Sequence, residues 1–176
     1  MALMPTSLAS HLTSSLGSAF RGERDISRTV VLLYVLINAV VVWNAWRHDP
    51  FSGYDMEPTG HPKYLQVLSE GRLPSRAETH EFFTPPLSYA VPAWSLALGL
   101  VDLGGALKAA QWLNAVYSLA LTFMLLRLCE LMRPQCAPLK QAALLLLGML
   151  PVYYKSFAFV RPEPLLAWLA LIAVSL

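Results

Sequence analysis

Asp55 and Glu57 form a D-x-E pair in the stretch GYDMEP. Two carboxylates at this spacing can both reach a divalent cation, or one can act as a general base while the other orients it. Gly53 before the pair and Pro58 after it predict a tight turn that presents both acids. His61 follows closely and could contact a phosphate or a sugar. Two solvated acids and a histidine that begins a helix are the commoner interpretation of such a stretch, so the pair needs support from elsewhere in the chain.

Two further stretches place charged side chains beside apolar runs. In ETHEFFTPPLSY, Glu81 stands at the expected edge of the bilayer, where an acid must face water, a partner or a ligand. In YKSFAFVRPEPLL, Arg161 and Glu163 are separated by one proline, and charges in such a place are functional or paired with each other. Lys155 and Arg161 are the natural candidates for holding an anionic phosphate.

The composition is that of a membrane protein. Hydrophobic residues make up 56% of the chain and charged residues 14%, against about 25% charged in soluble domains. The net charge of +2 and the scattered basic residues predict no nucleic-acid partner. Cys129 and Cys136 have no histidine or cysteine partner at metal-binding spacing, so we interpret them as reduced, inert thiols. The first 27 residues lack the apolar core of a cleaved signal peptide.

The apolar segments predict an all-α fold, a polytopic transmembrane helical bundle. Residues 29–46 are long enough to cross a hydrocarbon core of roughly 30 Å. The arginines that precede them place the N-terminus in the cytoplasm by the positive-inside rule. The acid-rich residues 48–86 then form a long extracytoplasmic first loop with short juxtamembrane helices, one of which opens at Pro62 and ends at Gly71.

The second half of the chain predicts further crossings. Residues 104–133 lead into a second cationic cluster that we expect inside, and residues 137–154 return to the outside. Residues 87–102, interrupted by Pro92, are open to three interpretations: a span, a re-entrant segment or a tilted interfacial helix. The simplest count of crossings leaves them short of a full span.

The last apolar stretch, LLAWLALIAVSL, is too short to finish a crossing. We therefore expect residues 1–28 to be a polar cytoplasmic tail and residues 29–176 to be the N-terminal part of a longer transmembrane module, truncated at its end. The same count of crossings places three acids on one outer face: Asp55, Glu81 and Glu163.

The order of these motifs resembles the GT-C class of membrane glycosyltransferases. GYDMEPTGHPKYLQVLSEGRLP is similar to the family's loop pattern of an acid, a short helix bearing His or Tyr, and Leu-x-x-Gly-x-Leu-Pro. HEFFTPPLSY is similar to its His-Pro-Pro-Leu-Tyr-Tyr signature, and AFVRPEPLL to its Arg-x-Asp motif. The groups that match best are the protein O-mannosyltransferase-like and aminoarabinose-transferase-like enzymes of bacteria. Thr84 and Ser88 depart from the second motif, and Glu163 replaces aspartate in the third.

The resemblance implies a reaction and roles for the residues above. Members transfer a sugar from a polyprenyl-phosphate carrier to a hydroxyl acceptor on the outer side of the membrane, with inversion. Asp55 is then the expected general base, with Glu57 as its catalytic companion. The residues expected to bind substrate and phosphate are His61, Lys155, Arg161, Glu81 and Glu163. A divalent metal ion is an expected cofactor, and its candidate ligands are Asp55, Glu81 and Glu163.

Two other classes of function remain as alternatives. A multi-pass transporter or flippase would place its charges near the bilayer midplane, whereas these acids gather in one outer loop and at one helix end. A non-catalytic membrane subunit would use the loop only to dock a partner. For the glycosyltransferase, the expected partners are the polyprenyl-phosphate sugar donor, the hydroxyl acceptor and the lipid bilayer. Compact loops favour a multi-pass protein of the bacterial plasma membrane.

Overall fold

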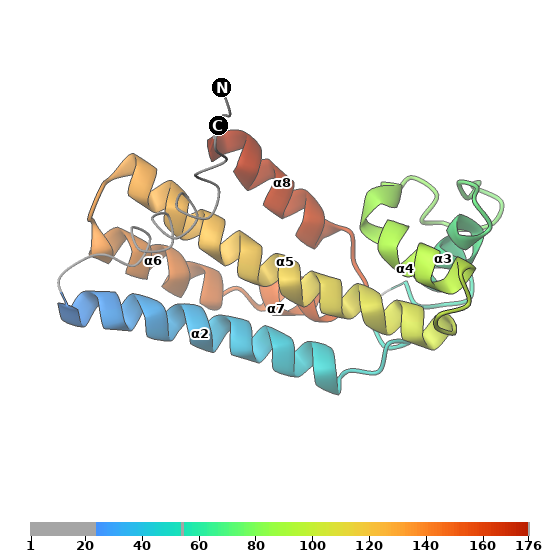
Figure 1. The fold of residues 1–176 in the computed structure, drawn as a ribbon, viewed down its shortest axis with the longest axis horizontal. Helices are drawn as coiled ribbons and strands as arrows, with labels where there is room; N and C mark the ends of the chain where they lie inside the picture. The colour runs from blue at the N-terminus through green and yellow to red at the C-terminus, as the bar shows by residue number, and fades with distance from the viewer. Residues whose placement is uncertain (1–23, 54, 176) are drawn as a thin grey trace, which may run out of the picture.

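The computed structural model describes residues 24–53 and 55–175, and within them the chain is helical without a strand. Residues 1–23 of the predicted cytoplasmic tail lie outside the described residues. The elements, labelled in Figure 1, are α2 (Arg24–Arg47), α3 (His61–Ser69), the 3₁₀-helix η1 (Pro86–Tyr89), α4 (Ala90–Ala97), α5 (Leu103–Met132), α6 (Ala137–Gly148), α7 (Pro151–Ala158) and α8 (Glu163–Ser175). The all-α prediction is confirmed.

Within the described residues, two helices are long and apolar enough to cross a membrane: α2, over Arg28–Arg47, and α5. Both coincide with spans predicted from the sequence. The bent pair α7–α8, with an angle of 113° between its helices, adds a third span if the pair is counted as one. Asp102 begins α5, because its side chain accepts a hydrogen bond of 2.7 Å from the backbone N–H of Gly105.

The helices α2, α5 and α6 run back and forth along one axis, whereas α8 is bent by 113° from α7. In Figure 1, α2, α6 and α7 run in one direction and α5 and α8 in the other, and α5 packs against all four of the others. The C-terminal ends of α2 and α7 and the N-terminal ends of α5 and α8 therefore face the end of the molecule that carries α3 and α4. Loops that join these ends are brought together there.

Hydrogen bonds between buried polar side chains link α2, α5 and α7. Asn38 donates to Thr122 Oγ1 at 3.0 Å, and Ser118 donates to Asn38 Oδ1 at 2.8 Å. The Ser118 hydroxyl also contacts the Tyr153 hydroxyl. Small hydroxyl and amide side chains are favoured between apolar helices, because no water competes for their hydrogen bonds. This cluster fixes the rotation of the three helices about their axes.

A lysine from α5 caps the C-terminal end of α2. Nζ of Lys108 donates to the backbone carbonyls of Ala45 at 2.6 Å, Trp46 at 3.1 Å and His48 at 2.7 Å. These are carbonyls that the last turn of a helix leaves without an intrahelical partner, and a cation is favoured at this end of the helix dipole. The contact fixes the point from which the chain enters the loop that carries Asp55.

The prediction that residues 137–154 form one continuous span is wrong. The helix breaks after Gly148, and the next one begins at Pro151, so neither α6 nor α7 is long enough to cross on its own. Proline has no N–H to continue the ladder and it forces the preceding residue out of the helical region. Leu150 accordingly has φ −87° and ψ 107°.

The stretch over residues 87–102 is also short of a span. η1 and α4 together cover residues 86–97, and α4 alone has 8 residues. Pro92 and Ala93 are buried, while Val91, Trp94 and Leu98 are more than half exposed. A one-sided apolar surface on a helix this short fits the re-entrant or interfacial interpretations rather than a crossing.

The short helix predicted after Gly60 is present as α3, with Pro62 in its first turn. α3 packs against α4, η1 and the start of α5. The buried core between them contains Tyr64, Leu65, Tyr89, Leu107 and Val160. Because Val160 belongs to the α7–α8 connection, this core holds the α3 region and that connection together.

Candidate functional site

The acid pair lies in a tight turn that leads directly into α3. Asp55 has φ 58°, the left-handed region that few residues other than Gly, Asn and Asp adopt readily. Its carbonyl accepts a hydrogen bond of 2.8 Å from the N–H of His61, and the N–H of Gly60 donates to Glu57 O at 2.9 Å. A Cβ on Gly60 would lie 1.8 Å from the carbonyl oxygen of Asp55. Only glycine allows the chain to close so tightly at this point.

The Asp55 carboxylate lies between a histidine and an arginine that come from distant parts of the chain. Oδ1 is 3.4 Å from Nε2 of His80, and Oδ2 is 3.5 Å from a guanidinium nitrogen of Arg161. The same His80 nitrogen is 3.9 Å from Glu57 Oε2 and 3.9 Å from Glu81 Oε1. Three acids therefore surround one imidazole, and one of them also faces a cation.

Glu81 is the buried member of this group, with 7% of its surface exposed. The Thr84 hydroxyl donates to Glu81 Oε2 at 2.7 Å, and the same oxygen is 4.0 Å from Nδ1 of His61. His61 is fully buried, and its Nδ1 lies 2.8 Å from the Tyr89 hydroxyl. Its Nε2 is a buried nitrogen without a hydrogen-bond partner in the structure. Such an orphan is rare in proteins and marks a place that a ligand could complete.

The buried imidazole is neutral at physiological pH. Burial lowers the pKa of His61 from 6.5 to about 4; the Arg161 guanidinium adds to this effect and the Asp55 carboxylate opposes it. A neutral imidazole has one nitrogen that can accept a hydrogen bond or bind a metal. The site therefore contains a neutral histidine, which comes from α3, close to ionisable acids from two loops.

The residues present fit a divalent cation. In the part of the chain that the structure describes, two sets have ligand atoms within 4.8 Å of one another: Asp55, Glu57 and His80, and Asp55, His61 and Glu81. Carboxylate oxygens and a neutral imidazole are ordinary ligands for such ions. Glu163, the third predicted ligand, belongs to neither set, and its carboxylate lies 3.6 Å from the Arg161 guanidinium instead.

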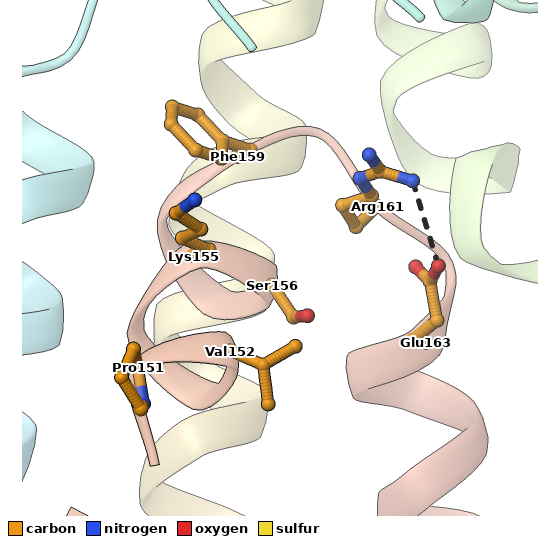
Figure 2. A pocket seen from close by; sticks show the side chains of 7 residues that line it. All are labelled: Pro151, Val152, Lys155, Ser156, Phe159, Arg161 and Glu163. Carbon is orange, nitrogen blue, oxygen red and sulfur yellow. Dashed lines mark ion pairs between the residues drawn. The ribbon is translucent and has the colours of Figure 1, made fainter. Parts of the chain in front are cut away.

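Three of the residues predicted to bind substrate and phosphate, Lys155, Arg161 and Glu163, line a hollow of about 370 Å³ at the break between α7 and α8, whereas His61 and Glu81 do not line it. We call it the cationic hollow; its lining residues are Pro151, Val152, Lys155, Ser156, Phe159, Arg161 and Glu163. Figure 2 shows Val152 and Ser156 on α7 facing the Arg161–Glu163 pair across it. Lys155 and Arg161 give it two cations against one acid, which suits an anionic group.

The structure thus brings seven of the predicted site residues to one end of the bundle. His61, Glu81 and Arg161 surround the Asp55–Glu57 turn, and Glu163 and Lys155 lie beyond Arg161 along the cationic hollow. Sequence reasoning gave no role to His80, Thr84 or Tyr89. The dense polar stretch Thr-His-Glu could have drawn attention to His80. No sequence pattern could have indicated the Tyr89–His61 contact, because only the fold brings these two residues together.

Comparison with protein-family models, with curated proteins and with solved structures gives no match for this chain.

Proposed function

We propose that this chain carries the catalytic site of a multi-pass membrane glycosyltransferase of the GT-C class. It transfers a sugar from a polyprenyl-phosphate donor to a hydroxyl acceptor, with inversion, on the outer face of a bacterial plasma membrane, and its N-terminus is cytoplasmic. One observation carries the proposal: the Asp55 carboxylate lies beside Arg161, and Arg161 lines the cationic hollow, which is large enough for a phosphate group. A base adjacent to an anion site is what this transfer requires.

The reaction is a single displacement. Asp55 takes the proton of the acceptor hydroxyl as its oxygen bonds to the anomeric carbon, and the bond from that carbon to the phosphate oxygen breaks with its electron pair leaving on the phosphate. A positioned general base contributes about 10²–10⁴-fold to the rate. Arg161 and Lys155 stabilise the charge that develops on the leaving phosphate, because cations already held in place need little reorganisation when that charge forms.

A divalent cation is part of the proposal, and Asp55, His61 and Glu81 would hold it. When bound, such an ion supplies positive charge for the phosphate group. Glu57 and Glu163 then orient their neighbours, His80 at 3.9 Å and Arg161 at 3.6 Å respectively.

A transporter or flippase is the second candidate, and the bend between α7 and α8 is the observation that favours it. Helices of transporters are often interrupted where charged groups bind a substrate, and Arg161 lies in the connection between this bent pair. Against it stands Asp55, which belongs to a loop turn rather than to a spanning helix.

The test compares Asp55→Asn with Asp49→Asn in membranes that contain the full-length protein. Asparagine adopts the left-handed region at least as readily as aspartate, so the turn survives and only the base is removed. Asp49 is a matched control: it is an exposed loop aspartate whose Oδ1 accepts a hydrogen bond from Phe51 N, which an asparagine oxygen can also accept.

The measurement is release of polyprenyl phosphate from a labelled polyprenyl-phosphate sugar, with transfer of the label to acceptor. We expect Asp55→Asn to lose at least 100-fold and Asp49→Asn to match the wild type. Transfer that survives in Asp55→Asn would remove Asp55 as the base. A wild type that moves the intact donor across vesicles without cleaving it would favour the flippase.

A further inference from the structure

A second hollow adjoins Asp55 through the carboxylate oxygen that does not face Arg161. Oδ1 of Asp55 contacts His80, and His80 lines a hollow of about 410 Å³. We call it the His80 hollow; its lining residues are Thr59, Arg76, Ala77, Glu78, Thr79, His80 and Phe82. It shares no lining residue with the cationic hollow. Each oxygen of the carboxylate therefore contacts a residue of a different hollow.

The His80 hollow combines hydrogen-bonding groups of both kinds with one aromatic ring. Hydrogen bonds from the N–H of Ser75, from Arg72 and from the Ser75 hydroxyl lower the pKa of Glu78 to about 2, so this carboxylate is ionised and accepts hydrogen bonds. Arg76 supplies donors, and Phe82 is 43% exposed. The opposite charges of Arg76 and Glu78 leave the lining without the cationic excess of the other hollow.

We propose that the His80 hollow is the acceptor subsite and that the acceptor is a carbohydrate. This inference rests on the proposed glycosyltransferase function. Inversion in one displacement requires the attacking hydroxyl and the leaving phosphate on opposite sides of the anomeric carbon, and Asp55 lies between a hollow suited to the phosphate and a second one. A hydroxyl bound in the second hollow is within reach of Asp55 Oδ1, which takes its proton.

The chemistry of the lining selects a sugar over other hydroxyl acceptors. Sugar hydroxyls pair with carboxylates and guanidinium groups, and the apolar face of a pyranose packs on an aromatic ring such as Phe82. Peptides are commonly bound along the edge of a sheet, and residues 24–53 and 55–175 contain no strand. Acyl chains suit the separate apolar hollow lined by residues such as Leu68, Leu87 and Trp94.

Two adjacent phenylalanines provide a matched pair of variants. The rings of Phe82 and Phe83 touch edge to face with their centroids 5.7 Å apart, but only Phe82 lines the hollow, and Phe83 is 72% exposed. We expect Phe82→Ala to raise the KM for a glycoside acceptor about tenfold and to leave the KM for the polyprenyl-phosphate sugar unchanged. Phe83→Ala should change neither. Arg76→Gln, at an exposed position, should also raise the acceptor KM. Because it changes no packed side chain, it keeps the test valid if Phe82→Ala fails to fold.

The assay uses the full-length protein with a panel of p-nitrophenyl hexosides and a serine-rich peptide as acceptors. Transfer to a hexoside, weakened by Phe82→Ala and Arg76→Gln, is the expected result. Donor cleavage stimulated by the peptide and not by any hexoside would overturn the carbohydrate acceptor alone, as would an acceptor KM that responds equally to Phe83→Ala. If the wild type cleaves no donor under any condition, the proposed function itself fails.

Discussion

Gly60→Ala is the sharpest test of how the turn before α3 presents Asp55. The φ of Gly60 is −93°, so the residue is not glycine for the sake of a left-handed conformation. Space is the constraint: an added Cβ would lie 1.8 Å from the Asp55 carbonyl oxygen and 2.5 Å from its carbonyl carbon. These are backbone atoms, which cannot rotate away as the end of a side chain can. The Asp55 peptide must therefore move by roughly an ångström or more, since non-bonded C and O atoms rarely approach closer than about 3 Å.

That displacement has a predictable effect on catalysis. A misplacement of about 1 Å in a reacting group can cost roughly 100-fold in rate, and the 2.8 Å hydrogen bond from His61 N to Asp55 O is lost as well. We expect Gly60→Ala to lower sugar transfer by about 100-fold while the protein still inserts into membranes, because α2 and α5 are untouched.

Gly71→Ala is the matched control for this prediction. Gly71 has φ 80°, but a Cβ there would meet no atom within 4 Å, so the substitution adds only the backbone strain of about 1–2 kcal/mol at the far end of α3. Transfer within a few-fold of wild type in Gly60→Ala, or an equal loss in Gly71→Ala, would refute the claim that the closure of this turn positions the base.

Three other perturbations test the stability of the fold, each by unfolding in detergent. Lys108→Met removes the ammonium that binds three carbonyls at the end of α2, and we expect a loss of about 1.5–3 kcal/mol, the contribution of a hydrogen bond to a charged group. Lys140→Met breaks the 2.7 Å ion pair with Glu130, in which the lysine is 1% exposed. We expect the free energy of unfolding to fall by about 3–5 kcal/mol, because the Glu130 carboxylate is left without its partner. Adding Glu130→Leu to this variant should restore part of the loss. Burial lowers the pKa of His61 from 6.5 to about 4. The free energy of unfolding is therefore unaffected by this residue above about pH 6.5 and falls by up to about 3 kcal/mol as the pH drops to about 4, because only the unfolded chain takes up the proton in that range. His61→Gln should lack this loss when both proteins are measured in EDTA.

Each of these has an outcome that contradicts it. Unchanged unfolding of Lys108→Met would mean that water replaces the ammonium without loss at the end of α2. A double variant of Lys140 and Glu130 that is no more stable than the single one would assign the loss to packing. Identical pH profiles for wild type and His61→Gln would assign the acid sensitivity to other groups.

Local sequence patterns predicted the helices whose signals are long and uninterrupted. α2 and α5 follow from apolar runs with charged residues at their ends, and α3 follows from Pro62 at its start, Gly71 at its end and apolar residues that share one face. The break between α6 and α7 was missed because the count of apolar residues gave Pro151 no weight. Hydrophobicity measures whether a segment prefers lipid, whereas the missing N–H of proline decides whether a helix can continue through it.

Part of the candidate site was also accessible without the fold. The D-x-E spacing, the charges beside apolar runs and their order along the chain pointed to Asp55, Glu81 and Arg161. His80 and Tyr89 were not found as members, because their roles depend on contacts with Asp55 and His61 that local patterns do not contain. The assignment of Glu163 to the metal ligands could not be weighed against its pairing with Arg161 until both side chains were placed.

By itself, the sequence determined that this is a helical, membrane-type chain with its polar chemistry gathered in one loop and one helix connection. Composition and apolar run length suffice for that, because the preference of a segment for lipid is a local property. Tertiary structure alone decided that Asp55 lies between His80 and Arg161, with a hollow beside each. That outcome depends on which helix ends meet and how each loop closes, and both follow from packing between segments far apart in the chain.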